Sequence, residues 1–342
     1  MKLSVLIPMY NVADYIEKCL SSLLSQRIDE QDYEIIIVND GSTDNSLEIA
    51  ESISNKHKNI TIYSQENKGA IFTRNKMLKL AKGDYLYFVD ADDYVACNSL
   101  APVLDFAVSN KMDIVGFDTL VTRSREKNKL DDFTDTNALP KIVTGIEYLK
   151  ENKNLRVEIW WYFIKKDFLN KHHITFDSIN YDGDVTFTLR LFLKAKKVAH
   201  FPLKIYRYFQ SSESTMRSDA IKTNKRIINY FMALIVDFTN LIDEVKKKEI
   251  SFKNPILSNF KFRRDVFAFF TITKMIKANL SIKEFKFNLS QLERINVYPI
   301  KNFNDEEFNS SRYKIMLRLM NYKPILFIIH VIYYALPKKI KK

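Results

Sequence analysis

Three carboxylates, Asp90, Asp92 and Asp93, follow directly on the apolar run from Tyr85 to Val89. The run has the composition of a buried strand, and open α/β sheets bind their ligands at the carboxyl ends of such strands. Like charges this close repel one another, so a hard divalent cation with oxygen ligands is the natural partner. Mg²⁺ or Mn²⁺ held by one or two carboxylates keeps coordination sites open for substrate phosphates. The alternative is a solvated acidic loop, and the remaining motifs of the N-terminal half favour the metal.

Short apolar runs alternate with helical patterns through the first hundred residues, which predicts a parallel sheet covered by helices on both faces. The helices are expected from about residue 16, from about residue 45, and at 70–81 and 100–108. The expected strands are rich in β-branched or aromatic residues and cover 3–7, 34–39, 60–64, 85–89 and 113–117.

Polar motifs follow each of the first four strands. Pro8 and Tyr10 end the first strand, and Asp40 ends the second. Lys68 and Gly69 come after the third, with Arg74 further along. Because the carboxyl ends of neighbouring parallel strands meet at one edge of a sheet, we expect these motifs and the acidic cluster to share one crevice.

The set of segments SVLIPMYN, VNDGSTD, NKG with TRN, and DADD, in this order, resembles the family 2 glycosyltransferases. Each segment alone is unspecific, but the four together are a strong signature. The resemblance implies a GT-A fold, which is a Rossmann-like, mostly parallel sheet flanked by helices. It also implies inverting transfer of a sugar from a nucleotide-sugar donor, UDP-linked, to a saccharide or lipid-linked saccharide in bacterial surface polysaccharide assembly.

The resemblance assigns roles to the motif residues. Tyr10 would stack on the uracil ring beside Pro8, and Asp40 would accept the ring N–H. Lys68 and Gly69 would let the backbone approach the nucleotide, and Arg74 would pair with its ribose or diphosphate oxygens. These residues could instead be turn, strand-end or helix-surface positions.

The resemblance also implies a different role for each aspartate of the acidic cluster. Asp90, with the adjacent Ala91, would contact the ribose directly or through the metal shell, and Asp92 would ligate the Mn²⁺ or Mg²⁺. Asp93 would support its neighbours or cap a helix. The metal would neutralise the charge that develops on the departing UDP.

The catalytic base is expected in a second block at about 155–210. Family members show an acidic pair leading into a helix, and here Asp184 takes the second position. Gly183 replaces the first acid, a departure for which Asp182 could compensate. Asp184 could alternatively be the N-cap of a helix over 185–194, or fill both roles.

Flanking aromatic segments belong to the acceptor side by the same resemblance. Trp160 and Trp161 would face opposite ways on a strand, so at least one is expected in the core. Ser214, Thr215 and Arg217 are weaker candidates for contacts with the diphosphate.

The N-terminal and C-terminal parts of the chain differ in net charge. Residues 1–200 hold 26 Lys+Arg and 29 Asp+Glu, whereas residues 201–342 hold 27 and 12. We expect a catalytic domain at 1–218, with a nucleotide-binding half at 1–95 and an acceptor-side half at 96–218. A basic, mainly helical region would cover 219–342, and its segment 323–342 could lie on an anionic membrane surface or pack as a core helix.

Bulk properties predict a cytoplasmic protein, which could also lie peripherally on the inner face of the membrane. Two cysteines without disulfide or metal spacing fit a reducing compartment, and the N-terminus lacks the pattern of a signal peptide. The alternatives are a nucleotide-sugar-binding protein without transfer activity, because of Gly183, and a nucleic-acid-binding protein. No nucleic-acid motif occurs, so no nucleic acid is expected as a partner.

Overall fold

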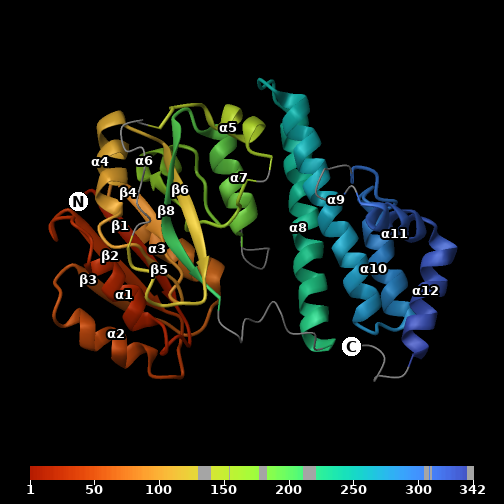
Figure 1. Ribbon diagram of the computed structural model, residues 1–342, viewed down its shortest axis with the longest axis horizontal. Helices are drawn as coiled ribbons and strands as arrows, with labels where there is room; N and C mark the ends of the chain where they lie inside the picture. The colour runs from red at the N-terminus through yellow and green to blue at the C-terminus, as the bar shows by residue number, and fades with distance from the viewer. Residues whose placement is uncertain are drawn as a thin grey trace. The chain divides into compact units, whose positions relative to one another are not determined.

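The computed structural model in Figure 1 describes residues 1–129, 140–153, 155–176, 183–210, 221–303, 308 and 310–336. The chain divides into two compact units, Met1–Ser212 and Glu213–Lys342. The first unit combines a sheet with helices, and the described part of the second unit is helical. The predicted domain boundary after residue 218 lies outside the described residues.

The first unit is built on a mixed sheet of eight strands in the order β3-β2-β1-β4-β7-β6-β8-β5. Strands β1 to β4 are parallel, as predicted for the first hundred residues. Beyond β4 the sheet becomes mixed, since β7 runs antiparallel to both β4 and β6. The strands are β1 Leu3–Met9, β2 Tyr33–Asn39, β3 Ile60–Ser64, β4 Tyr85–Phe88, β5 Tyr94–Val95, β6 Ile114–Thr122, β7 Tyr162–Lys165 and β8 Val198–Phe209.

Helices flank this sheet (Figure 1). The helices expected from about residues 16 and 45 and over 70–81 and 100–108 are confirmed, and every bound that was predicted lies within two residues of the observed one. The first buries Ile16, Leu20 and Leu23, the apolar face read from the sequence. The helices of the first unit are α1 Ile16–Leu24, α2 Ser46–Ser54, α3 Ala70–Leu80, α4 Leu100–Asn110, α5 Gly145–Glu151, α6 Lys166–Lys171 and α7 Asp184–Lys194.

Strand register brings the polar motifs to one edge. Met9 of β1 pairs with Asn39 of β2, and Asn39 pairs with Ser64 of β3. On the other side of β1, Leu6 pairs with Phe88, the last residue of β4. The chain segments that follow these strands therefore leave the sheet side by side, which is the arrangement that a ligand-binding edge requires.

The long strand β8 carries the aromatic residues Tyr206 and Tyr208. It pairs with β6 in parallel and with the short β5 in antiparallel orientation, with Tyr94 opposite Arg207. Because β5 lies just beyond the acidic cluster, this pairing brings β8 beside it. The two-residue β5 is too short for a periodic pattern to reveal it in the sequence.

The second unit contains α8 Ile221–Lys247, α9 Lys253–Lys277, α10 Ile282–Arg294, α11 Ser311–Asn321 and α12 Lys323–Ala335. Its core includes Phe269, Phe285 and Leu326. Among the described residues, no single helix has the length and apolar character to cross a membrane. Helices α11 and α12 meet that criterion only as a pair, which is bent by 100°.

Candidate active site

Asp40, directly after β2, anchors the loop that leads into α3. Its Oδ1 accepts hydrogen bonds from the Lys68 backbone N–H and the Gln65 side chain, both at 2.8 Å. Its Oδ2 accepts one from the Gly69 N–H, also at 2.8 Å. Gly69 is the N-cap of α3 and has a φ of 84°, a conformation that favours glycine. A carboxylate oxygen with one bond can accept another, so the uracil contact of Asp40 stays a prediction.

Tyr10 lies at the end of β1, and its side chain faces solvent with 49% of its surface exposed. The next residue, Asn11, has a φ of 52° and accepts a hydrogen bond from the Thr43 N–H at 2.8 Å. The turn after β1 is therefore tied to the turn after β2. An aromatic ring held open in this way can serve as a stacking wall, although the stacking roles of Tyr10 and Pro8 stay predictions.

The three aspartates after β4 converge around a tight turn. The Asp93 N–H donates to the Asp90 carbonyl at 3.1 Å, and the turn encloses the buried Ala91. One carboxylate oxygen from each aspartate lies within 4.8 Å of the others. Asp92 is exposed and Asp90 is half-buried, whereas Asp93 is buried. This set of hard oxygen donors fits a divalent cation, with Asp92 the most accessible ligand.

Asp93 links the acidic turn to β8 through hydrogen bonds. Its Oδ2 accepts a hydrogen bond from the Tyr206 hydroxyl and its Oδ1 one from the Phe209 N–H, both at 2.7 Å. Burial, with the charges of Asp92 and Asp90, raises the pKa of Asp93 well above its usual range. Both oxygens bind β8, so Asp93 fastens that strand to the acidic turn rather than capping a helix.

Tyr206 is the supporting residue that the sequence analysis missed. Its hydroxyl also accepts a hydrogen bond from the Asp90 N–H at 3.3 Å. Its ring stacks on Trp160 with the centroids 4.3 Å apart. The alternation of Tyr206 and Tyr208 along a strand was the available signal, because residues two apart share a face.

Arg74 joins the acidic turn to the predicted base. Its Nη1 donates to Asp184 Oδ1 at 2.7 Å, and its Nη2 lies 3.7 Å from Asp90 Oδ1. The arginine is 7% exposed and lies in α3, whose first turn the Asp40 loop positions. The structure therefore brings Arg74 and Asp90, which the strand order was expected to place in one crevice, together with Asp184 of the second block.

Asp184 is the first residue of α7, so its alternative role as N-cap is wrong. The N-cap is Gly183, which has a φ of 67°. A Cβ at Gly183 would lie 3.3 Å from the Phe176 ring. The glycine that replaces the family's first acid thus occupies a left-handed turn in a tight space, and the side chain of Asp184 keeps 16% of its surface exposed.

Other predicted residues have different outcomes. Trp160 and Trp161 precede β7 rather than lying on a strand, and both are buried. The Lys68 ammonium lies 4.8 Å from the centroid of the Phe72 ring. Asp182 and the weak diphosphate candidates Ser214, Thr215 and Arg217 fall outside the described residues.

Residues 4–178 match the model of the family described as Glycosyl transferase family 2. The chain is 32% identical over 215 residues to the uncharacterized glycosyltransferase EpsJ of Bacillus subtilis, and the match covers 62% of each chain. It is 34% identical over 214 residues to the poly(ribitol-phosphate) beta-glucosyltransferase of Bacillus spizizenii, covering 58% of this chain and 31% of that one. These matches span less than two thirds of either relative.

The crystal structure of S. aureus TarS 1–349 in complex with UDP superposes with a TM-score of 0.67 at 19% identity. The superposition covers 98% of this chain and 89% of the TarS chain. This likeness confirms the expected fold, a helix-flanked mixed sheet of the GT-A type with a helical C-terminal extension.

Proposed function

The chain belongs to glycosyl transferase family 2, and from that premise we propose that it transfers a sugar from a UDP-sugar to a hydroxyl of a surface saccharide or polyol chain. The observation that carries the proposal is the convergence of Arg74, Asp90 and Asp184 at the carboxyl edge of the sheet. The Arg74 guanidinium, which can pair with phosphates, contacts the Asp184 carboxylate, which can accept a proton from the acceptor hydroxyl. The names of EpsJ and the poly(ribitol-phosphate) glucosyltransferase support the reaction class.

In the proposed reaction, Tyr10 and Asp40 receive the uracil, and the Arg74 guanidinium pairs with donor oxygens. Asp184 takes the proton from the acceptor hydroxyl. That oxygen forms a bond to the anomeric carbon as the bond from this carbon to the diphosphate breaks. Attack from the face opposite UDP inverts the anomeric configuration, and UDP leaves with the electron pair. The UDP complex of TarS, a protein of the same fold, supports UDP as the nucleotide.

A divalent cation, Mn²⁺ or Mg²⁺, fits the acidic turn in this proposal. Asp92 is the main ligand because it is exposed, and Asp90 can contribute a second oxygen. Both carboxylate oxygens of Asp93 accept hydrogen bonds, from Tyr206 and Phe209, so Asp93 would stabilise the turn rather than bind the ion. The ion would supply positive charge to the diphosphate of the leaving group.

We also propose that the second unit attaches the protein to the inner face of the cell membrane. Ile328 and Ile332 of α12 are each 57% exposed, and their spacing of four places them on one helix face. Residues 308–342 contain eight Lys+Arg and no acidic residue. An apolar face among basic residues suits an anionic leaflet, and each basic residue near such a surface adds about 1 kcal/mol. Leu326 and His330 of the same helix are buried, so α12 also contributes to the core.

Calorimetric titration of UDP into the protein, with and without Mn²⁺, tests the proposed function. Wild-type protein should bind UDP more tightly with Mn²⁺, and Asp92→Asn should lose the gain because one ligand carboxylate is removed. Asp167→Asn, an exposed aspartate in the first turn of α6, is the matched control and should retain the gain. A UDP affinity that changes neither with Mn²⁺ nor in Asp92→Asn would refute the metal site. Absence of UDP binding would refute the proposal that the donor is a UDP-sugar.

A further inference from the structure

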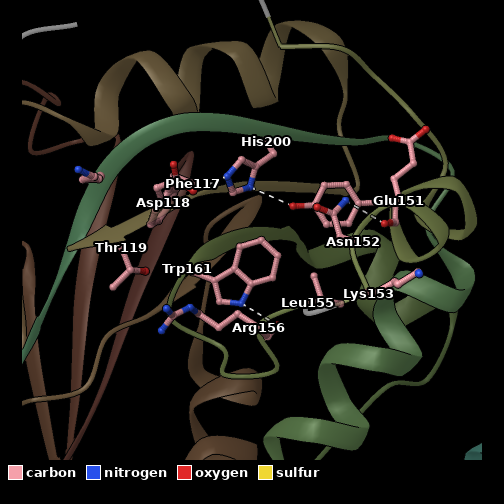
Figure 2. A pocket seen from close by; sticks show the side chains of 12 residues that line it. Phe117, Asp118, Thr119, Glu151, Asn152, Lys153, Leu155, Arg156, Trp161 and His200 are labelled. Atoms are coloured by element: carbon pink, nitrogen blue, oxygen red, sulfur yellow. Dashed lines mark hydrogen bonds and ion pairs between the residues drawn. The ribbon is translucent and has the colours of Figure 1, made fainter. Parts of the chain in front are cut away.

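A pocket opens in the first unit between β6, β8, α5 and the segment that follows α5 (Figure 2). Its volume is about 670 Å³, which is within the range of about 300–1,000 Å³ typical of small-ligand sites. None of the motif residues that the sequence analysis assigned to the nucleotide, the metal or the base lines it. The pocket is therefore distinct from those residues of the candidate active site.

A hydrogen-bonded series crosses one wall of the pocket. His200 Nδ1 lies 3.1 Å from the Tyr148 hydroxyl, and His200 Nε2 lies 2.8 Å from Asp118 Oδ1. Both ring nitrogens are engaged, so the imidazole has a defined orientation. The hydrogen bond from His200 lowers the pKa of Asp118, and the charges of Lys204 and Arg156 lower it further. Asp118 is thus a carboxylate already paired with the histidine.

Trp161 lies beside the same series, with its ring centroid 5.9 Å from that of His200. The Trp161 ring packs against Gly116 of β6, where an added Cβ would lie 2.5 Å from the ring. The Trp161 indole N–H donates to the Arg156 carbonyl at 3.2 Å, which fixes the backbone that carries the arginine (Figure 2). Groups that are held in place before binding lose less conformational entropy when a ligand binds.

The charge of the lining favours an anion. The lining contains three basic side chains, those of Lys153, Arg156 and Lys204. It contains two acidic ones, Asp118 and Glu151, and Asp118 is paired with His200. The Arg156 guanidinium lies 5.0 Å from the centroid of the Trp160 ring. It donates no hydrogen bond to any of the residues that the structure describes, so its planar set of N–H donors can receive a phosphate or carboxylate.

Contacts connect this pocket to the candidate active site. Arg156 lies over Trp160, Trp160 stacks on Tyr206, and the Tyr206 hydroxyl donates to Asp93. Three successive side-chain contacts through the buried Trp160 and Tyr206 therefore link the pocket to the acidic turn. A chain-like acceptor could occupy both at once, with its reacting hydroxyl at Asp184 and a more distant unit in the pocket.

We propose that this pocket binds an anionic, hydroxyl-rich segment of the acceptor chain, with Arg156 and Lys204 receiving its phosphodiester or carboxylate groups. The amide of Asn152 and the polar groups of Asp118 and Tyr148 provide hydrogen-bond partners for hydroxyls. The proposal rests on the proposed glycosyl transfer, because it gives that reaction an acceptor class.

Binding of defined oligomers to the full chain tests it. The probes are a ribitol phosphate oligomer, a galacturonic acid oligomer and a neutral malto-oligosaccharide, titrated calorimetrically at low and high salt. An anionic oligomer should bind more tightly than the neutral one and weaken with salt. Its affinity should fall about tenfold or more in Arg156→Ala, because charged hydrogen bonds are lost. The phosphate and carboxylate arms identify which anion the pocket prefers.

Lys58→Ala is the matched control, since it removes an exposed positive charge before β3 and away from the pocket lining. This variant should bind the anionic oligomer like wild type, and UDP affinity should be unchanged in both variants. Equal affinity for neutral and anionic oligomers, or an unchanged affinity in Arg156→Ala, would overturn the proposal. UDP binding without oligomer binding refutes the pocket alone, whereas Arg156-dependent oligomer binding without UDP binding refutes the proposed donor and leaves the pocket supported.

Discussion

Arg74 of α3 and Asp184 of α7 form a 2.7 Å ion pair although 110 positions separate them in the chain. The side chain of Arg74 is 8% exposed and that of Asp184 is 16% exposed, so solvent screens the pair only partly. A carboxylate beside an arginine is a weaker base than an isolated one. We therefore expect the donor diphosphate to compete for Arg74 and to leave Asp184 freer to accept a proton.

Replacement of the predicted base should separate chemistry from binding. Asp184→Asn keeps the shape of the side chain but removes the proton acceptor, so sugar transfer should fall about 10²–10⁴-fold. UDP affinity should be retained or rise, because the neutral amide competes less with the diphosphate for the Arg74 guanidinium. Initial transfer rates and calorimetry on the same preparation measure both quantities. Asp167→Asn is the control for the loss of one negative charge, and full transfer activity in Asp184→Asn would remove it as the base.

Arg74→Lys tests whether the guanidinium geometry matters beyond its charge. Lysine retains the positive charge but cannot span Asp90 and Asp184 with one planar group. We expect UDP affinity to fall about tenfold, the loss of roughly one charged hydrogen bond. Arg27→Lys, at an exposed position, is the control and should bind UDP like wild type. A wild-type affinity in Arg74→Lys would mean that the positive charge alone suffices for UDP binding.

Acid should destabilise the second unit through Glu284. The Lys225 ammonium and the backbone and hydroxyl of Ser281 lower its pKa from 4.5 to about 2. A lowered pKa in the folded state stabilises the fold above the unfolded value, and that contribution is lost as the pH falls from about 4.5 to about 2. The side chain is largely exposed, so solvent screening keeps the effect small.

The measurement for Glu284 is the free energy of unfolding by urea at several pH values across that window. Glu284→Gln should be less stable than wild type near neutral pH and should show a shallower decline in acid. Glu249→Gln, whose side chain is exposed, should retain the wild-type decline. Parallel curves for wild type and Glu284→Gln would show that this carboxylate does not contribute to acid sensitivity.

The membrane proposal predicts binding to vesicles of phosphatidylglycerol and weaker binding to vesicles of phosphatidylcholine. High salt should reduce the binding, because exposed charges are screened. The double variant Ile328→Asp with Ile332→Asp should co-sediment less, since it places carboxylates on the apolar face. Val236→Asp of α8, which alters an exposed apolar residue elsewhere in the same unit, is the control. Equal binding to both vesicle types would contradict an electrostatic contribution.

Local patterns were sufficient for most elements of the first unit. The apolar runs of β1 to β4 and the periodicity of α1, α3 and α4 identify these elements because burial acts residue by residue. The antiparallel insertion of β7 between β4 and β6 was not predictable, since strand order depends on contacts far apart in sequence. Trp160 and Trp161 show the same limit, because their burial comes from packing against β8 and α7.

The sequence by itself determined which side chains could perform the chemistry. The four motifs, Arg74 and the carboxylates Asp90, Asp92 and Asp184 could be named from residue types, spacing and family resemblance. Only the tertiary structure decided their partners: Asp93 binds β8, Arg74 joins Asp90 to Asp184, and Arg156 lies beside Trp160. The physical reason is that motif chemistry resides in neighbouring residues, whereas ion pairs and pockets arise when the sheet brings distant segments together.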